Sequence, residues 1–319
     1  MNKQLYIIIF LTLLSLHTEG VKAQQEGAQT LFMFNSLAIN PGVAGSKETP
    51  TFTLLSRYQW VGFKGAPIEQ NLGFHTAAFS SKRLGFGLNL GNRKSGVFSA
   101  QVATMSWSYS PVKTEDFSIR IGLSGTVRRF GFNFETDEQL NILSGERGLD
   151  VSARMYGNFG MGMLATYKEC FFGVSIPYFY ENIIGINPES PTTALESRHY
   201  YVMGGLDIPI SKKLHYRPSG VLRLVKNAPW GFDLNNSLIY NDELTFGMGF
   251  RAGKSNMSGG GESLDMLIFY QINPKWGLGC AYDYNISPLK KYTGGSIEVV
   301  ARFDLKQTVL KLSNPRVFF

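Results

Sequence analysis

The feature that most constrains this chain is the regular alternation of apolar and polar side chains along segments of strand length. Phe117, Ile119, Ile121 and Leu123 alternate with Ser118, Arg120, Gly122 and Ser124. Residues 232–240 and 244–251 repeat this pattern, with Asn236 as an exception on the apolar face of the first. Successive side chains of a strand point to opposite faces, so each segment predicts a strand with one apolar face and one polar face.

Fourteen such segments follow one another between residues 51 and 304. They lie near residues 51–60, 69–80, 84–91, 97–111, 116–130, 156–167, 170–180, 197–210, 214–225, 231–240, 244–251, 264–272, 276–284 and 295–304. Bacterial outer-membrane barrels formed by one chain have an even number of antiparallel strands with apolar residues outside and polar residues inside. We therefore predict an all-β transmembrane barrel of about 14 antiparallel strands over residues 50–305.

The connections between the segments alternate in length. Short polar turns recur at 81–83, 112–115, 168–169, 211–213, 241–243 and 273–275, and longer links fall at 131–154, 181–196, 252–263 and 285–294. Outer-membrane barrels have short periplasmic turns and longer extracellular loops. This rule places both termini in the periplasm.

Aromatic residues cluster near the ends of the expected strands, as in the girdles of membrane barrels. The girdle positions are Tyr58, Trp60, Trp107, Tyr109, Tyr178, Tyr180, Tyr200, Tyr201, Trp276, Tyr282 and Tyr284. The alternative architecture is a pair of soluble β-sandwiches, which would not need an apolar face on every strand.

The first residues have the pattern of an export signal. Lys3 precedes an apolar-rich run from Leu5 to Leu16, and Val21-Lys22-Ala23 supplies a cleavage site before Gln24. The alternative is a single membrane anchor, but this run is well below the roughly 20 residues that a helix needs to cross a bilayer. Residues 1–23 are therefore predicted to be a signal peptide.

Two segments lie outside the expected barrel. Residues 24–49 show no strand period and carry apolar groups that need cover, either by folding into the barrel mouth as a plug or by meeting a periplasmic partner; disorder is the alternative. Residues 306–319 form a C-terminal tail that combines basic, aliphatic and aromatic side chains. We expect these two ends to bind a partner, through Phe34, Asn35, Asn40 and Pro41 and through Arg316, Phe318 and Phe319.

Charged residues fall on the polar, inward faces of several strands. These are Arg57, Arg120, Arg217, Arg223, Arg251 and Arg302, facing Asp233, Asp283 and Glu298. Unpaired charge is costly in a dry interior, so one interpretation is a hydrated wall in which the charges neutralise each other. The other is that surplus arginine holds an acidic plug or partner segment.

Nothing in the chain has the spacing of a catalytic, cofactor or metal site. His75, His199 and His215 lie on separate expected strands, and Cys170 and Cys280 are far apart. The glycine-rich stretches at 85–87 and 259–261 lack the strand-to-helix context of a phosphate loop. The formal charge of +7 is dispersed, whereas nucleic-acid binding needs clustered basic residues. We predict a non-enzymatic protein without cofactor; a passive porin and an outer-membrane hydrolase remain as alternatives.

Short motifs along nearly the whole chain resemble one family. They are residues 33–35, 39–46, 57–67, 172–177, 199–201, 218–219, 228–229, 233–235, 240–241, 282–284 and 295–296, and the tail Pro315-Arg316-Val317-Phe318-Phe319. Together they resemble the PorP/SprF proteins of the type IX secretion and gliding motility system of Bacteroidota. The chain departs from this family at Ile297, where Gly-Ser-His-Glu is usual.

The resemblance implies an outer-membrane barrel that supports export or surface anchoring of secreted proteins. Its implied partners are periplasmic lipoprotein and ring components and a secreted cargo or surface adhesin, in addition to the lipid of the outer membrane.

Overall fold

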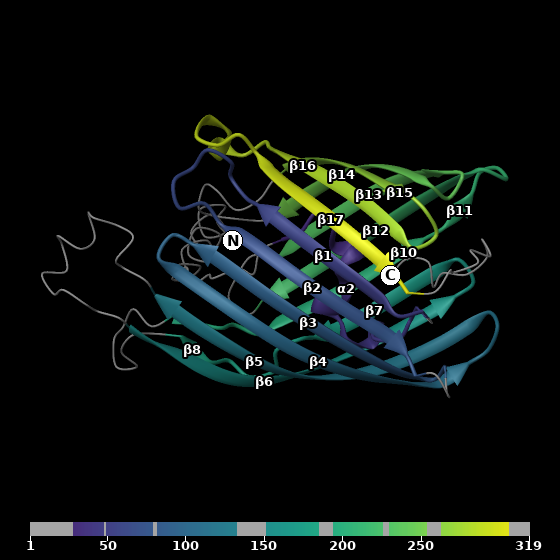
Figure 1. The fold of residues 1–319 in the computed structure, drawn as a ribbon, viewed down its shortest axis with the longest axis horizontal. Helices are drawn as coiled ribbons and strands as arrows, with labels where there is room; N and C mark the ends of the chain where they lie inside the picture. The colour runs from purple at the N-terminus through teal and green to yellow at the C-terminus, as the bar shows by residue number, and fades with distance from the viewer. Residues whose placement is uncertain are drawn as a thin grey trace, which may run out of the picture.

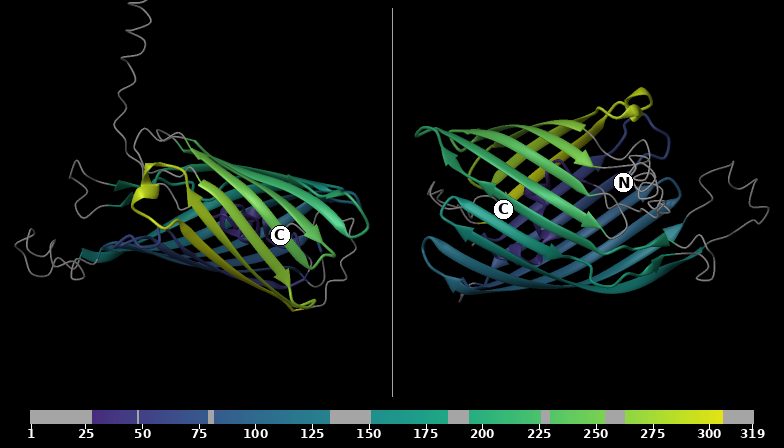
Figure 2. Two further views of the ribbon diagram at one scale, coloured as in Figure 1. Left: turned by 90° about the horizontal axis from the view of Figure 1, so that it is seen from above. Right: turned by 180° about the vertical axis from the view of Figure 1, so that it is seen from behind.

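The computed structural model describes residues 28–47, 49–78, 82–132, 151–184, 194–225, 230–253 and 263–305, which form a closed antiparallel β-barrel. Figure 1 shows the strands tilted around the barrel, and Figure 2 shows the continuous wall from above and from behind. The barrel strands are β1 (Thr51–Tyr58), β2 (Ile68–Ala77), β3 (Leu84–Ser95), β4 (Phe98–Lys113), β5 (Phe117–Phe132), β6 (Val151–Tyr167), β7 (Cys170–Ile176), β10 (His199–Leu206), β12 (Leu214–Val225), β13 (Gly231–Tyr240), β14 (Leu244–Gly253), β15 (Ser263–Gln271), β16 (Trp276–Asn285) and β17 (Ser296–Asp304). These are the 14 predicted strands, and the prediction of the fold is confirmed.

The barrel closes where its first and last strands pair. β1 and β17 run antiparallel from Thr51 opposite Asp304 to Tyr58 opposite Ile297. β10 and β12 pair directly, and the two-residue strand β11 (Ile208–Pro209) only extends this hairpin. The wall therefore has no free strand edge, which is the condition for a sheet to cross lipid.

The two faces of the strands separate as the sequence pattern predicts. In β5, Leu123 is 58% exposed on the outer face, whereas Ser124 is 6% exposed and faces the lumen. The same alternation holds in β13 and β14, where Leu234, Leu238, Phe246 and others point outward. Cys280 also lies exposed on the outer face, and neither cysteine forms a disulfide.

Some details of the strand ends differ from the prediction. β1 ends at Tyr58, and Trp60 lies in the following turn with a φ of 53°. β7 ends at Ile176 because Pro177 has no N–H group for a ladder hydrogen bond. Tyr178 and Tyr201 are buried inside the barrel and are not girdle residues; Tyr201 follows the outward-facing Tyr200, so it must point inward.

A small hairpin, β8 (Ile183–Ile184) and β9 (Ala194–Leu195), lies within one of the long links and was not predicted. A 3₁₀ turn, η3 (Pro288–Lys291), lies in another.

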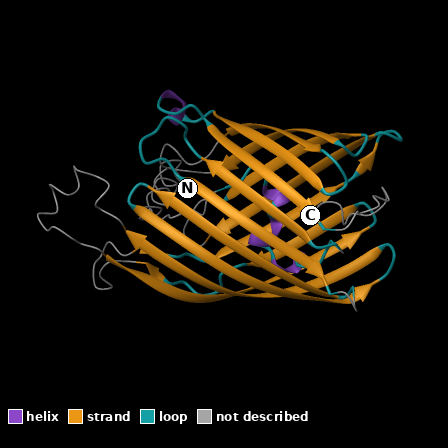
Figure 3. Cartoon of the chain, viewed as in Figure 1, coloured by secondary structure: helices purple, strands orange, loops and turns teal. Residues whose placement is uncertain are grey.

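Residues 28–47 lie inside the barrel. They form three short turns of helix, η1 (Phe32–Phe34), α2 (Ser36–Ile39) and η2 (Pro41–Val43), which Figures 1 and 3 show within the ring of strands. We call residues 28–47 the lumenal segment. Together with residues of the wall, its apolar side chains form two buried apolar clusters in the described part of the chain.

The lumenal segment runs along the barrel from one end to the other. Thr30 contacts Glu298 and Asp283 near the end that carries the long links, and Lys47 contacts Asp304 at the end with the short turns. The described chain therefore begins at the long-link end, whereas Leu305 follows β17 at the short-turn end. The expectation that both ends lie on one side does not hold for the described residues, because the segment passes through the lumen before β1 begins.

Among the described residues, no helix has the length and apolar character needed to cross a membrane. The predicted signal peptide, the tail 306–319 and the glycine run 259–261 lie outside the described residues.

Candidate functional site: the occupied lumen

The lumenal segment is bound at its beginning by one carboxylate of the last strand. The backbone N–H of Thr30 donates to Glu298 Oε1 at 2.7 Å, and the N–H of Leu31 donates to Oε2 at 2.7 Å. The side chain of Glu298 is completely buried. Both of its oxygens are therefore occupied by the backbone of the segment.

Glu298 belongs to an ionic cluster on the lumenal wall, which we define as Arg57, Arg223, Asp233, Arg251, Asp283 and Glu298. Arg57 forms ion pairs with Glu298, opposite it in the β1–β17 register, and with Asp283, at 2.7 Å. Because a buried charge is costly unless it is paired, the close pairing explains why these residues are tolerated inside the barrel.

The ionic cluster continues to β12–β14 and also holds the hydroxyl of Thr30. Arg251 Nε lies 2.5 Å from Asp233 Oδ1, and Arg223 Nη2 lies 2.9 Å from Asp233 Oδ2. Thr30 Oγ1 donates to Asp283 Oδ1 at 2.5 Å and accepts from Arg251 Nη2 at 3.0 Å. The cluster thus binds the segment through two backbone groups and one side chain.

The later part of the segment lies directly against glycines of the wall. A Cβ atom added at Gly122 would lie 2.3 Å from the carbonyl carbon of Pro41, and one at Gly85 would lie 2.2 Å from the carbonyl oxygen of Ala44. A Cβ at Gly162 would lie 2.2 Å from Asn40 Oδ1. Since such distances are impossible for real Cβ atoms, these glycines make the room that η2 occupies.

Polar contacts complete this second attachment. Asn40 Oδ1 accepts the backbone N–H of Gly42 at 2.8 Å and so caps η2, while Asn40 Nδ2 donates to the carbonyl of Met163 at 3.1 Å. The hydroxyl of Ser108 donates to the carbonyl of Ala44, and the hydroxyl of Ser175 donates to that of Ile39. Side chains of the wall thereby supply hydrogen bonds to backbone carbonyl groups of the segment.

Lys47 attaches the end of the segment where it leaves the lumen. Its Nζ lies 2.6 Å from Asp304 Oδ1, which also accepts from Thr51 Oγ1 at 2.6 Å. Burial, together with the nearby charge of Arg302, lowers the pKa of Lys47 to about 8. Strand β1 begins shortly after it, at Thr51.

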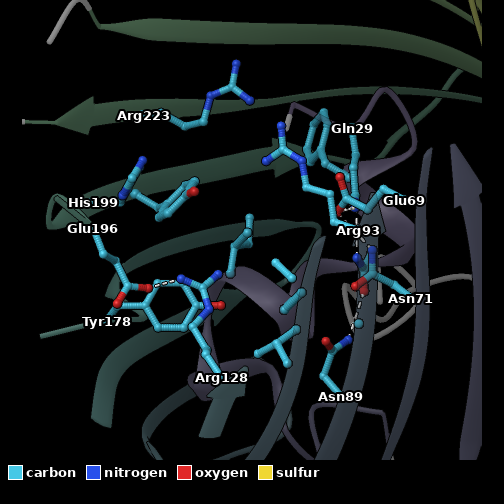
Figure 4. Close-up of a pocket in the computed structure, with 18 of the residues that line it drawn as sticks. Gln29, Glu69, Asn71, Asn89, Arg93, Arg128, Tyr178, Glu196, His199 and Arg223 are labelled. Carbon is cyan, nitrogen blue, oxygen red and sulfur yellow. Dashed lines mark hydrogen bonds and ion pairs between the residues drawn. The ribbon is translucent and has the colours of Figure 1, made fainter. Parts of the chain in front are cut away.

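Among the described residues, the lumen holds a cavity on either side of the segment. One of about 160 Å³ lies toward the long links and contains the groups drawn in Figure 4, where Arg93, Arg128 and Arg223 approach from three strands. The other, of about 90 Å³, lies toward the short turns and is lined by Arg217, Asp242 and Arg302 among others. Phe32 borders both cavities, so the segment separates them.

The structure places all nine predicted lumenal charged residues on the inner face of the wall, but it does not bring all of them together. Arg57, Arg223, Asp233, Arg251, Asp283 and Glu298 form the ionic cluster. Arg120 instead donates to the carbonyl of Arg83 at 3.0 Å, and Arg217 pairs with Asp207 at 2.6 Å. These two arginines lie toward the short turns. Arg302 also lies outside the ionic cluster, and its Nη2 donates to Gln271 Oε1 at 2.6 Å.

The residues predicted to contact a partner divide between two places. Phe34 stacks on Phe269 with ring centroids 4.6 Å apart, and Asn35, Asn40 and Pro41 are buried in the lumen. Arg316, Phe318 and Phe319 lie outside the described residues. Contact with a partner stays a prediction for both sets.

Some residues that build this site were not singled out from the sequence. Thr30 carries no local pattern, and its role depends on residues more than 250 positions away. The wall glycines did have a recognisable feature, since Gly85, Gly122 and Gly162 all occupy inward positions of strands where glycine marks close backbone approach. Ile297 is 40% exposed on the outer face, so the departure from the family pattern does not alter the lumen.

Within the described residues, no group of three or more His, Cys, Asp or Glu side chains could hold a metal ion. His75, His199 and His215 are buried on separate strands of the inner wall.

Comparison with solved structures shows the same fold at low sequence identity. The deltaS2S3 mutant of the monoaromatic hydrocarbon channel TodX matches with a TM-score of 0.51 and 10% identity, over 90% of this chain and 100% of that one. The toluene transporter TbuX of Ralstonia pickettii matches with a TM-score of 0.50 and 12% identity, over 92% and 100%. No curated protein sequence matches the chain.

A family model matches nearly the whole chain. Residues 21–303 match the family described as type IX secretion system membrane protein PorP/SprF, which spans the lumenal segment and the barrel almost to the end of β17. The chain therefore belongs to the PorP/SprF family of type IX secretion system membrane proteins.

Proposed function

We propose that this protein is a closed, non-enzymatic barrel of the outer membrane that supports export or surface anchoring of proteins secreted by the type IX system. The observation that carries this proposal is the lumenal segment, which fills the barrel and is attached by Glu298, by the wall glycines and by Lys47. Because the protein's own chain blocks the lumen, the barrel is suited to binding other proteins at its surfaces and not to conducting solutes.

The orientation that we propose follows the lengths of the connections. The short turns and the tail 306–319 face the periplasm, and the long links face the cell exterior. The beginning of the lumenal segment then opens toward the exterior mouth. The tail, with Arg316, Phe318 and Phe319, is the contact for periplasmic lipoprotein or ring components of the secretion system, and the long links meet the secreted cargo or surface adhesin.

A bilayer experiment and a secretion experiment test the proposal together. Wild-type protein should give little steady ion conductance in planar bilayers. A variant lacking residues 32–43, with a flexible linker in their place, should conduct if its barrel still inserts. In cells that lack the chromosomal copy, wild-type protein should restore secretion of a surface protein.

Three outcomes would contradict the proposal. Steady conductance by the wild-type barrel would favour the passive porin, and normal secretion in cells without the protein would remove it from the export pathway. Hydrolysis of lipid or peptide that is lost on a single Ser, His or Asp substitution would favour the enzyme.

A further inference from the structure

The outer surface of the barrel carries one polar patch at the long-link end of β2–β5. Gln70, Asn92, Gln101 and Arg129 are opposite one another in register on these four adjacent strands. All four side chains are exposed and point outward, away from the lumen. They form a continuous row across the wall.

The row marks a change from apolar to polar on the outer face of β3–β5, while on β2 the apolar Ile68 lies outward beyond Gln70. Two positions nearer the short turns, the outward residues of the same strands are Leu72, Leu90, Ala103 and Val127. On the opposite side of the barrel, the outward residues stay apolar or aromatic almost to the strand ends, as in Phe250, Leu264, Tyr282 and Tyr284. The polar row is therefore a local feature.

The side chains of the row are arranged by contacts with each other. Arg129 Nη1 donates to Gln101 Oε1 at 3.2 Å, and Asn92 Nδ2 lies 3.5 Å from Gln70 Oε1. Lys94 and Ser99 are paired beside the row on β3 and β4. These six residues include two cations and no carboxylate.

The patch lies at the edge of the apolar belt, so its neighbours in a membrane are known. In a barrel that crosses a membrane, the groups beside the wall directly beyond the apolar belt are lipid headgroups. Side-chain amides can bond the hydroxyl groups of a sugar, and a guanidinium forms a paired set of hydrogen bonds with a phosphate. Lys94 adds a second positive charge for the same anion.

We propose that Gln70, Asn92, Lys94, Ser99, Gln101 and Arg129 bind the phosphorylated sugar headgroup of a glycolipid in the outer leaflet. The inference rests on the membrane placement proposed above and not on the role in secretion. The bound lipid fixes the β2–β5 side of the barrel against the membrane and leaves strands β7–β16 free for other contacts.

The test is a binding measurement with the full chain in a non-ionic detergent. The probes are lipopolysaccharide without O-polysaccharide, the same lipid after removal of its phosphates, and phosphatidylethanolamine. Wild-type protein should prefer the phosphorylated glycolipid. The double variant Lys94→Gln with Arg129→Gln should lose about tenfold in affinity or more, since two charge-assisted hydrogen bonds are lost.

A second double variant removes the same charge from the other rim. Lys212 and Lys275 are exposed on short turns, and Lys212→Gln with Lys275→Gln should bind the glycolipid as wild type does. Lys94→Arg should also retain binding. Heat-modifiable gel mobility shows whether each variant is folded.

Equal affinity of wild type and the Lys94/Arg129 variant, or an equal loss in the Lys212/Lys275 variant, would overturn the proposal. Unchanged glycolipid binding with reduced secretion would identify the row as a contact for a protein and would also overturn it. Because the binding assay contains no cargo, its failure is distinct from failure of the proposed secretion function.

Discussion

Glu298 and Arg57 form an ion pair directly across the seam at which the first and last strands of the barrel meet. Glu298 also accepts the backbone N–H groups of Thr30 and Leu31. One carboxylate therefore connects the closure of the barrel with the attachment of the lumenal segment. A segment that precedes β1 in the sequence is bound by the strand that ends the barrel.

Replacement of this carboxylate tests the attachment. Glu298→Gln removes the charge opposite Arg57 and one of the two acceptors for the segment, while Asp283 still pairs with Arg57. We expect a loss of about 3 kcal/mol in the free energy of unfolding, at the lower end for a broken buried ion pair. Hydrogen exchange should show reduced protection of the amides of residues 30–39.

The matched control is Glu115→Gln, which removes the same charge from an exposed turn. Its hydrogen exchange and thermal midpoint should equal those of the wild type. Full protection of residues 30–39 in Glu298→Gln would show that the segment is held without the ionic cluster.

The wall glycines provide a test within a single strand. Gly122 and Gly125 both lie in β5, but only Gly122 touches the segment; a Cβ at Gly125 has nothing within 4 Å. Gly122→Ala should destabilise the protein by about 1–3 kcal/mol because the methyl group overlaps Pro41. Gly125→Ala should be close to neutral. Chemical unfolding of the two variants checks this, and equal stability would mean that the segment does not press on the wall.

The two faces of β14 can be compared at adjacent positions. Phe246 is exposed on the outer face, whereas Thr245 lines the cavity of about 90 Å³ in the lumen. Phe246→Arg should cost about 2–4 kcal/mol if its position is near the membrane midplane. Thr245→Arg should fold in normal yield. The folded yield of each variant is measured by heat-modifiable gel mobility. Equal yields would show that the lipid-facing and lumenal faces of β14 are assigned wrongly.

The C-terminal tail distinguishes partner binding from barrel insertion. Deletion of residues 313–319 removes Arg316, Phe318 and Phe319 and should leave a barrel that inserts, because β17 ends at Asp304. The truncated protein should no longer co-purify with periplasmic components or support secretion. A truncated protein that fails to insert would make the tail an insertion signal, and one that secretes normally would contradict the partner contact.

The sequence by itself determined the wall of this protein. The alternation that places Leu123 outward and Ser124 inward is a property of each strand alone, since one face meets lipid and the other meets polar groups. Turn positions between the strands are equally local, so the number and order of strands follow from the chain. The length of a strand is less certain from sequence. The pattern predicts a strand over residues 170–180, but β7 ends at Ile176 because Pro177 has no N–H group to donate to the neighbouring strand.

Only the tertiary structure decided what fills the barrel. The sequence gives the lumenal segment no period, so it could not distinguish a plug from a partner contact. Its position depends on pairs such as Thr30 with Glu298, which are 268 residues apart, and on glycines that lie together only once β3, β5 and β6 are in register. Such contacts follow from the closure of the whole ring and are not a property of any one strand, and this is the physical reason why they could not be read from local pattern.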